Sequence, residues 1–231
     1  MRVQLNRVIV VIALLVGLPV IAVAGKVHER GGRRIARALI AVVGRVCGVR
    51  FVAQGKDRLD PGVSYVFVPN HSSPLDIPAL LMARPDVEFL AGADLFRFRL
   101  LAAAMRALGT RPIDRHDAGN ARRQIRELME GGGPQRLVVF AEGGIAPAGE
   151  RLPFATGAFV LAVKAGASVV PVAIHGTDRV LPPRANLALR PGTVTVEFLP
   201  PIPTEGKGIR DRRALRDATR DAVVAALAAR R

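Results

Sequence analysis

The chain has 231 residues, half of them hydrophobic, which is enough for one sizeable domain with a full apolar core. Its formal net charge of +15 favours anionic partners, namely nucleic acid, a membrane surface or phosphorylated ligands. With no Trp, a single Tyr and no zinc-finger, RNA-recognition or heptad pattern, the sequence argues against nucleic acid among these. The one cysteine, Cys47, excludes an intramolecular disulfide and a Cys-rich metal site.

An uncharged apolar run, VIVVIALLVGLPVIAVA (8–24), lies close to the N-terminus with basic residues on both sides. It is at the short end for a spanning helix, which needs roughly 20 apolar residues. Three interpretations compete: a signal peptide with a cleavage site at AVA-G, a buried helix of a soluble protein, and a membrane anchor that spans or half-inserts. The anchor is preferred because the basic cluster after the run would hold the downstream domain on the cytoplasmic side. We therefore expect a protein of the inner (cell) membrane.

A second apolar helix is predicted over IARALIAVVGRVCGV (35–49). Arg37 and Arg45 lie about 80° apart around its axis, so they share roughly one side. The helix therefore fits either an interfacial position with a thin basic edge or the core of the domain. Residues 1–49 are predicted to form a membrane-anchoring helical region, and residues 50–231 the main domain.

The remainder of the chain alternates β-rich runs with helical runs. Strands are predicted at 65–70, 86–92, 136–144, 168–176 and 193–202, a short strand or turn at 110–114, and helices at 73–83, 95–109, 118–133, 157–167 and 208–231. Such alternation predicts an α/β fold with a mostly parallel sheet flanked by helices. Ligand sites in these sheets gather beyond the carboxyl ends of strands, and the segments with His71 and Glu142 each follow a predicted strand.

The stretch NHSSPLD (70–76) places a histidine and an aspartate five positions apart. In a continuous helix these positions are about 140° apart, so the side chains meet only if His71 precedes the helix and Asp76 lies in its first turn. Ser73 as N-cap and Pro74 at the first helical position would put Asp76 at the third, where the helix dipole favours an ionised acid. The carboxylate could then cap the helix, or hold one imidazole nitrogen and leave the other as a base. The spacing alone leaves both roles open.

Four short blocks follow one another along the chain, and together they are more specific than the histidine–aspartate pair. They read NHSSPLD (70–76), LGTRPIDR (108–115), VVFAEGG (138–144) and VVPVAIHG (169–176), with LPFATGAFVLAVKAG (152–166) before the last. In order and spacing they resemble the motifs of the glycerolipid acyltransferase family, the 1-acylglycerol-3-phosphate acyltransferase-like group, over about residues 50 to 205. An N-terminal apolar helix is also common in that group.

The resemblance implies a glycerol-3-phosphate acyltransferase-like fold and acyl transfer from acyl-CoA or acyl-carrier protein to a lyso-lipid hydroxyl. His71 would be the general base, and Asp76 would hold the imidazole tautomer. The alkoxide would attack the thioester directly, with no acyl-enzyme, metal or organic cofactor. The residues implied in binding the acceptor head group are Arg111, Arg115, Glu142 and Gly143.

The third block departs from the family pattern. Ala141, Gly144 and Ile145 stand where the family usually has Pro, Thr and Arg, and two further segments lack a Lys that is often present. Either another arginine supplies the missing charge, with Arg97, Arg99, Arg122 and Arg151 as candidates, or the acceptor has a different head group. From the residues alone, a surface ion pair of Arg115 with Asp114 or Asp117 is the better interpretation.

The resemblance therefore favours an enzyme of phospholipid synthesis that acylates 1-acylglycerol-3-phosphate to phosphatidic acid. The alternative within the same chemistry is an acceptor of another kind: an ornithine-type lipid, a lysophospholipid or a glycolipid. A third hypothesis is a non-catalytic, basic lipid-binding protein of the membrane surface. The intact pair of His71 and Asp76 argues against that third hypothesis.

Overall fold

The computed structural model describes residues 2–28, 30–114, 117, 119–120, 123–124, 127, 135–147, 150–183 and 185–230. These residues form one seven-stranded sheet in the order β1-β7-β6-β2-β5-β3-β4. The strands are β1 (Val49–Gln54), β2 (Tyr65–Pro69), β3 (Glu88–Gly92), β4 (Thr110–Ile113), β5 (Arg136–Val138), β6 (Ser168–His175) and β7 (Gly192–Phe198). Neighbouring strands are parallel except β6 and β7, so the predicted mostly parallel sheet is confirmed.

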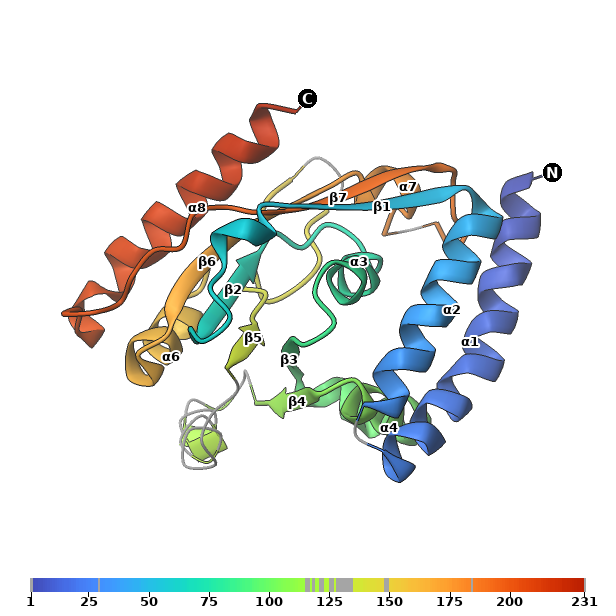
Figure 1. The fold of residues 1–231 in the computed structure, drawn as a ribbon, viewed down its shortest axis with the longest axis horizontal. Coiled ribbons are helices and arrows are strands. Elements are labelled where there is room, and N and C mark those ends of the chain that lie inside the picture. Colours follow the sequence, from blue (N-terminus) through green and yellow to red (C-terminus); the bar gives the residue numbers. More distant parts are fainter. Residues whose placement is uncertain are drawn as a thin grey trace.

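Helices cover both faces of the sheet (Figure 1). They are α1 (Arg2–Val27), α2 (Gly31–Cys47), α3 (Asp76–Ala83), α4 (Arg99–Ala107), α6 (Gly157–Ala165), α7 (Thr177–Val180) and α8 (Arg212–Ala228), with short 3₁₀ turns η1 (Lys56–Arg58), η2 (Ala93–Arg97) and η3 (Ile209–Asp211). In Figure 1, α6 and α8 lie on one side of the sheet, and α3 lies on the other with α1 and α2 beyond it.

The central strand β2 is buried on both faces, which explains why the sheet lies between two layers of helices. All five of its residues are buried, and successive side chains point to opposite faces. Tyr65 and Phe67 join the core beneath α3, whereas Val66 and Val68 join the core beneath α6 and α8. A strand buried on both faces reads as a continuous apolar run, as parallel strands between helices do.

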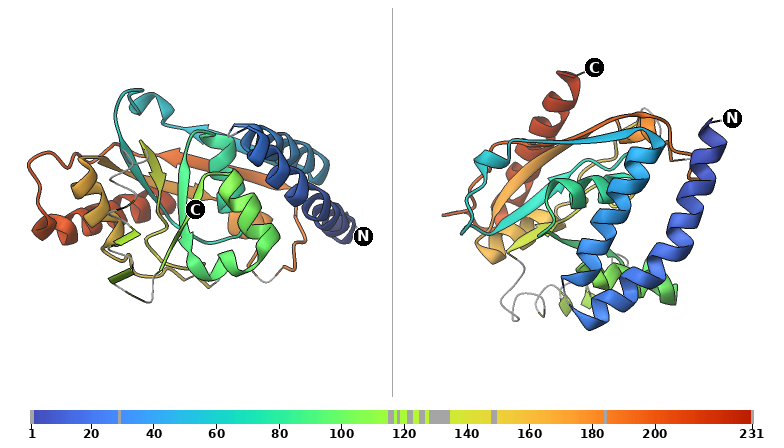
Figure 2. Two further views of the ribbon diagram at one scale, coloured as in Figure 1. Left: turned by 90° about the horizontal axis from the view of Figure 1, so that it is seen from below. Right: turned by 45° about the vertical axis from the view of Figure 1, so that its right-hand side comes forward.

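The N-terminal helices α1 and α2 form a hairpin along one side of the domain (Figure 2). Near its C-terminal end α1 packs closely on α4. The approach is so close that a Cβ added at Gly25 would lie 2.3 Å from the Cβ of Ala107. Near its N-terminal end the buried amide of Asn6 donates to the Leu189 carbonyl at 2.9 Å and to the Cys47 carbonyl at 3.4 Å. Both ends of α1 are therefore tied to the body of the protein.

Among the described residues, α1 is the helix whose length and composition would suit it to cross a membrane. Only 17% of its most apolar window is buried. Its outward face is a row of large exposed apolar side chains, including Leu5, Ile12, Leu15, Val16 and Val23.

Several predicted boundaries are wrong. The helix predicted over 95–109 is two pieces, η2 and α4, which meet at Phe98. The strand predicted over 136–144 ends at Val138, and β1 and α7 were not predicted. Most of the helix predicted over 118–133 lies outside the described residues.

Candidate active site

Three loops meet where β2, β5 and β6 end. They follow parallel strands that are neighbours in the sheet, so their first residues share one edge. They surround a cavity of about 260 Å³. Its lining includes His71 after β2, Glu142 after β5, and His175 at the end of β6.

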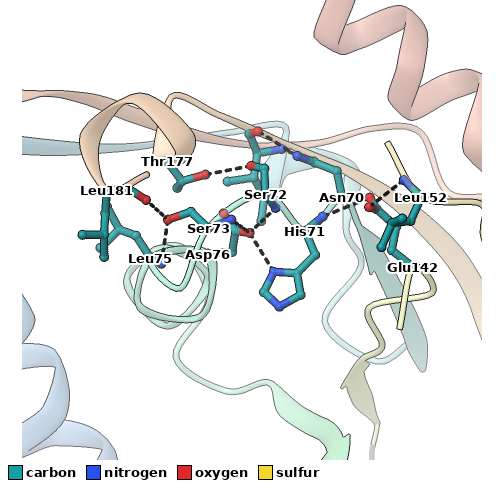
Figure 3. Close-up of polar contacts among 11 residues, drawn as sticks. Asn70, His71, Ser72, Ser73, Leu75, Asp76, Glu142, Leu152, Thr177 and Leu181 are labelled. Atoms are coloured by element: carbon teal, nitrogen blue, oxygen red, sulfur yellow. Dashed lines mark hydrogen bonds and ion pairs between the residues drawn. The ribbon is translucent and has the colours of Figure 1, made fainter. Parts of the chain in front are cut away.

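His71 and Asp76 are in direct contact beside this cavity (Figure 3). The Nδ1 atom of His71 lies 2.8 Å from Oδ2 of Asp76. Asp76 is fully buried, and 13% of the His71 side chain remains exposed. A carboxylate oxygen can only accept a hydrogen bond, so Nδ1 carries the proton and Nε2 is left as the basic nitrogen. The imidazole also stacks on Phe140, with ring centroids 4.0 Å apart.

The same Asp76 oxygen organises the loop between β2 and α3. It accepts hydrogen bonds from the backbone N–H groups of Ser72 at 2.8 Å and Ser73 at 3.0 Å. Its position at the start of α3 also places it at the positive end of the helix dipole. One side chain therefore holds both the loop and the imidazole, whereas the N-cap residue of α3 is Leu75, which makes no side-chain cap hydrogen bond.

The start of α3 differs from the prediction. The helix begins at Asp76 after Leu75, so Ser73 is not its N-cap residue. The Ser73 hydroxyl is instead used within the loop: it donates to the Leu181 carbonyl at 2.6 Å and accepts from the Leu75 N–H at 3.1 Å. The geometric condition is nevertheless met, because His71 precedes the helix and Asp76 lies in its first turn.

Asn70 fixes the beginning of the His71 loop to β6. Its buried amide donates to the Ile174 carbonyl at 3.1 Å and accepts from the Ile174 N–H at 2.8 Å. Next to it, the Ser72 and Thr177 hydroxyls lie 3.3 Å apart. The side chain of Asn70 thus continues the hydrogen bonding between β2 and β6 just beyond Pro69, the last residue of β2.

Glu142 reaches the cavity, but its carboxylate is engaged by the backbone. Oε1 accepts from the His71 N–H at 3.1 Å, and Oε2 accepts from the Leu152 N–H at 3.3 Å (Figure 3). Burial raises the pKa of Glu142 above its usual range, and these two N–H groups partly offset that effect. In this geometry Glu142 positions the loop that contains His71.

Two other residues expected at the head-group site, Gly143 and Arg111, do not line the cavity. Gly143 turns the chain after Glu142 with a φ of +72°, which favours glycine, and it is not among the cavity-lining residues. Arg111 is on β4, 53% exposed, and paired with Glu88 at 2.8 Å, so it too is outside the cavity. Arg115 lies outside the described residues.

The cavity is instead lined by basic residues, two of which were not predicted from the sequence as site residues. Arg179 on α7 and Arg230, just beyond α8, line it together with Arg151, which the sequence had offered as one substitute cation. Arg179 follows the fourth block by three residues, so proximity in sequence could have found it. Arg230 could not be found this way, because its place depends on how α8 packs. In the described part of the chain, no group of three or more His, Cys, Asp or Glu side chains could hold a metal ion.

Comparison with known proteins identifies the family. A family model described as Acyltransferase matches residues 50–175, more than half of the chain. The 1-acyl-sn-glycerol-3-phosphate acyltransferase alpha of Mus musculus is 31% identical over 222 residues, which cover 95% of this chain and 77% of that protein. This chain belongs to the acyltransferase family. It is an enzyme, as the four blocks predicted.

Two further comparisons agree with this assignment. The 1-acyl-sn-glycerol-3-phosphate acyltransferase alpha of Homo sapiens is 31% identical to this acyltransferase over 90% of this chain and 73% of that protein. The crystal structure of the 1-acyl-sn-glycerophosphate acyltransferase PlsC from Thermotoga maritima has the same fold, with a TM-score of 0.73, 22% identity and 96% of both chains covered. The expected fold class is therefore confirmed over nearly the whole chain.

The tie between Asn70 and β6 can be tested by stability. In Asn70→Leu the buried N–H and C=O groups of Ile174 lose their partners, and each buried unsatisfied group costs about 1–3 kcal/mol. We expect a clear fall in the free energy of unfolding of the detergent-solubilised protein, measured by denaturant titration. The matched control is Ser72→Ala, which removes only the 3.3 Å hydroxyl contact with Thr177. Equal losses in the two variants would contradict the role given to Asn70.

Proposed function

We propose that this acyltransferase moves a fatty acyl group from acyl-CoA or acyl-carrier protein to the free hydroxyl of 1-acylglycerol-3-phosphate, giving phosphatidic acid. The observation that carries the proposal is the contact of His71 with the buried Asp76, beside a cavity lined by arginines. The names of the relatives supply the acceptor.

In the proposed reaction, Nε2 of His71 removes the proton from the acceptor hydroxyl. The hydroxyl oxygen attacks the thioester carbonyl carbon, the carbon–sulfur bond breaks, and the thiolate takes the proton from the imidazolium. Asp76 keeps Nδ1 protonated and stabilises the imidazolium, the part that the carboxylate plays in a catalytic triad. A general base of this kind contributes about 10²–10⁴ in rate.

The other site residues have separate roles in this proposal. Glu142 holds the backbone of His71 in place, and the turn at Gly143 lets the chain leave β5 toward Leu152. Arg115 remains a proposed ligand of the acceptor head group. Arg111 is proposed to contact the head group only from the outer edge of the sheet, because its guanidinium is paired with Glu88.

A different acceptor is the second candidate, and one observation favours it. Ile145 occupies the position of the usual arginine of the third block, and its apolar side chain is 37% exposed. An acceptor with a less charged head group, such as an ornithine-type lipid or a glycolipid, would need fewer cations there.

We also propose that residues 1–49 anchor the acyltransferase domain, residues 50–231, to the cytoplasmic face of the inner (cell) membrane. Asn6 and Gly25 tie the two ends of α1 to the domain, so the helix runs along its side and does not project away from it. Its exposed apolar face would enter the lipid, with basic residues of the α1–α2 turn at the membrane surface.

The catalytic assignment predicts that His71→Ala lowers kcat by at least about 10²-fold, since the proton acceptor is removed. Asp76→Asn should also lower kcat, because an amide can favour the wrong tautomer of His71. Turnover is measured with a labelled acyl thioester. His71→Ala should keep wild-type membrane sedimentation and thermal stability, and substantial residual turnover in that variant would defeat the general-base role.

The acceptor assignment predicts that kcat/KM for 1-acylglycerol-3-phosphate exceeds that for monoacylglycerol by about tenfold or more, because a charged head group makes stronger hydrogen bonds. The measurement is an acceptor panel with one labelled acyl-CoA, and it includes lysophosphatidylcholine, an ornithine-type lyso-lipid and a glycolipid. If 1-acylglycerol-3-phosphate is acylated no faster than the uncharged lyso-lipids, the second candidate replaces the first.

The membrane assignment predicts that the double variant Ile12→Asp, Val16→Asp shifts the protein from the membrane pellet to the supernatant. These side chains are 55% and 61% exposed on one face of α1, and a charge there opposes entry into lipid. The matched control, Ala214→Asp with Ala218→Asp on the exposed face of α8, should sediment like the wild type. Unchanged sedimentation of the α1 variant would refute insertion through this face.

A further inference from the structure

Two arginines that share the cavity with His71 come from segments outside the first three sequence blocks. Arg151 follows the third block, and Arg179 lies on α7, which begins directly after the β6 loop. Both line the same cavity as His71. The candidates Arg97 and Arg99 do not line it, and Arg97 lies over the Phe98 ring, with 4.8 Å from Cζ to the ring centroid.

Arg151 and Arg179 are available to bind a ligand. Both are exposed, and within the described part of the chain neither forms an ion pair with a carboxylate. Arg230 is different, because its guanidinium lies 3.5 Å from Glu197 and also donates to Gln54. Arg230 therefore fixes the end of the chain to the sheet, while the other two are free to turn toward a ligand.

Three acidic residues also line the cavity, as many as the arginines. The carboxylate of Glu142 already accepts two backbone N–H groups. Glu150 and Asp178 are exposed neighbours of the two arginines in sequence, and they also line the cavity. These carboxylates would weaken the binding of an anion, so removing the charge of one of them should strengthen that binding.

His175 is the second histidine that lines the cavity. Burial lowers the pKa of this histidine, and the nearby charge of Arg230 lowers it further, with a smaller effect from Arg179. Glu197, 3.5 Å away, acts in the opposite direction. The cationic form of His175 is thus disfavoured. The permanent positive charges of the cavity are therefore those of its arginines.

We propose that Arg151 and Arg179 together form a phosphate-binding subsite beside His71. This inference rests on the proposed function, since it concerns a phosphate on one of the two substrates. Arginine suits this task because its planar guanidinium can donate two hydrogen bonds to phosphate oxygens. The phosphate belongs either to the lyso-lipid acceptor or to the CoA part of the donor.

The test is steady-state kinetics of the full-length enzyme in neutral phosphatidylcholine vesicles. Arg151→Gln and Arg179→Gln should each raise the KM for 1-acylglycerol-3-phosphate by about tenfold, since a charge-assisted hydrogen bond is lost. The KM for acyl-CoA stays unchanged if the phosphate is the acceptor's. If the KM for acyl-CoA rises instead, the subsite stands and binds the donor.

Two matched variants separate a local subsite from a general loss of charge. Arg213→Gln removes an exposed arginine near the start of α8, about 20 Å along the helix axis from Leu227 at the cavity, and should leave both KM values unchanged. Asp178→Asn removes a repelling carboxylate and should lower the KM that the arginine variants raise.

Failure of this inference is distinguishable from failure of the proposed function. A wild-type enzyme that does not acylate 1-acylglycerol-3-phosphate overturns the proposed function. If the wild type does acylate it, and both KM values are unchanged in Arg151→Gln and Arg179→Gln, only the subsite is overturned. An equal rise of KM in Arg213→Gln overturns the subsite as well.

Discussion

One buried carboxylate oxygen, Oδ2 of Asp76, accepts hydrogen bonds from the imidazole of His71 and from two consecutive backbone N–H groups. A buried charge is costly unless it is well hydrogen-bonded, and here the donors come from the loop that it organises. The loop and the carboxylate therefore stabilise each other. Any movement of the loop away from α3 would leave a charge in the core, so His71 stays beside the cavity.

The rest of the sheet fixes this unit in place from both sides. Asn70 hydrogen-bonds both backbone groups of Ile174 on β6, and Glu142 holds the His71 N–H from the end of β5. Both neighbours are strands parallel to β2, so their carboxyl ends reach the same edge. The parallel strands thus bring three separate sequence blocks to one cavity, and on the far side of β6 the sheet continues through the antiparallel β7 to the edge strand β1.

How far the sequence predicts this structure depends on how local each feature is. Strands β2 and β6 were predicted almost to the residue, because strands buried on both faces are continuous apolar runs. For His71 and Asp76, helix geometry gave only the condition for contact, that the histidine precedes the helix and the aspartate lies in its first turn, and the structure meets that condition. Strand β1 was missed because it directly follows the apolar pattern of α2. The signal that could have separated them is Gly48, which ends α2 with a φ of +75°.

The basic residues that line the cavity were predicted less well, because their places depend on packing between distant segments. Arg111 belongs to the second sequence block, but β4 is an edge strand of the sheet. There the guanidinium of Arg111 is paired with the carboxylate of Glu88 on β3. Arg230 is near the end of the chain and reaches the cavity only because α8 packs along β6. Residue types and spacing therefore identify the reaction, whereas the charges that line the cavity are set by tertiary structure. The chain thus lacks the arginine of the third block at Ile145, yet three arginines from other segments line the cavity that contains His71.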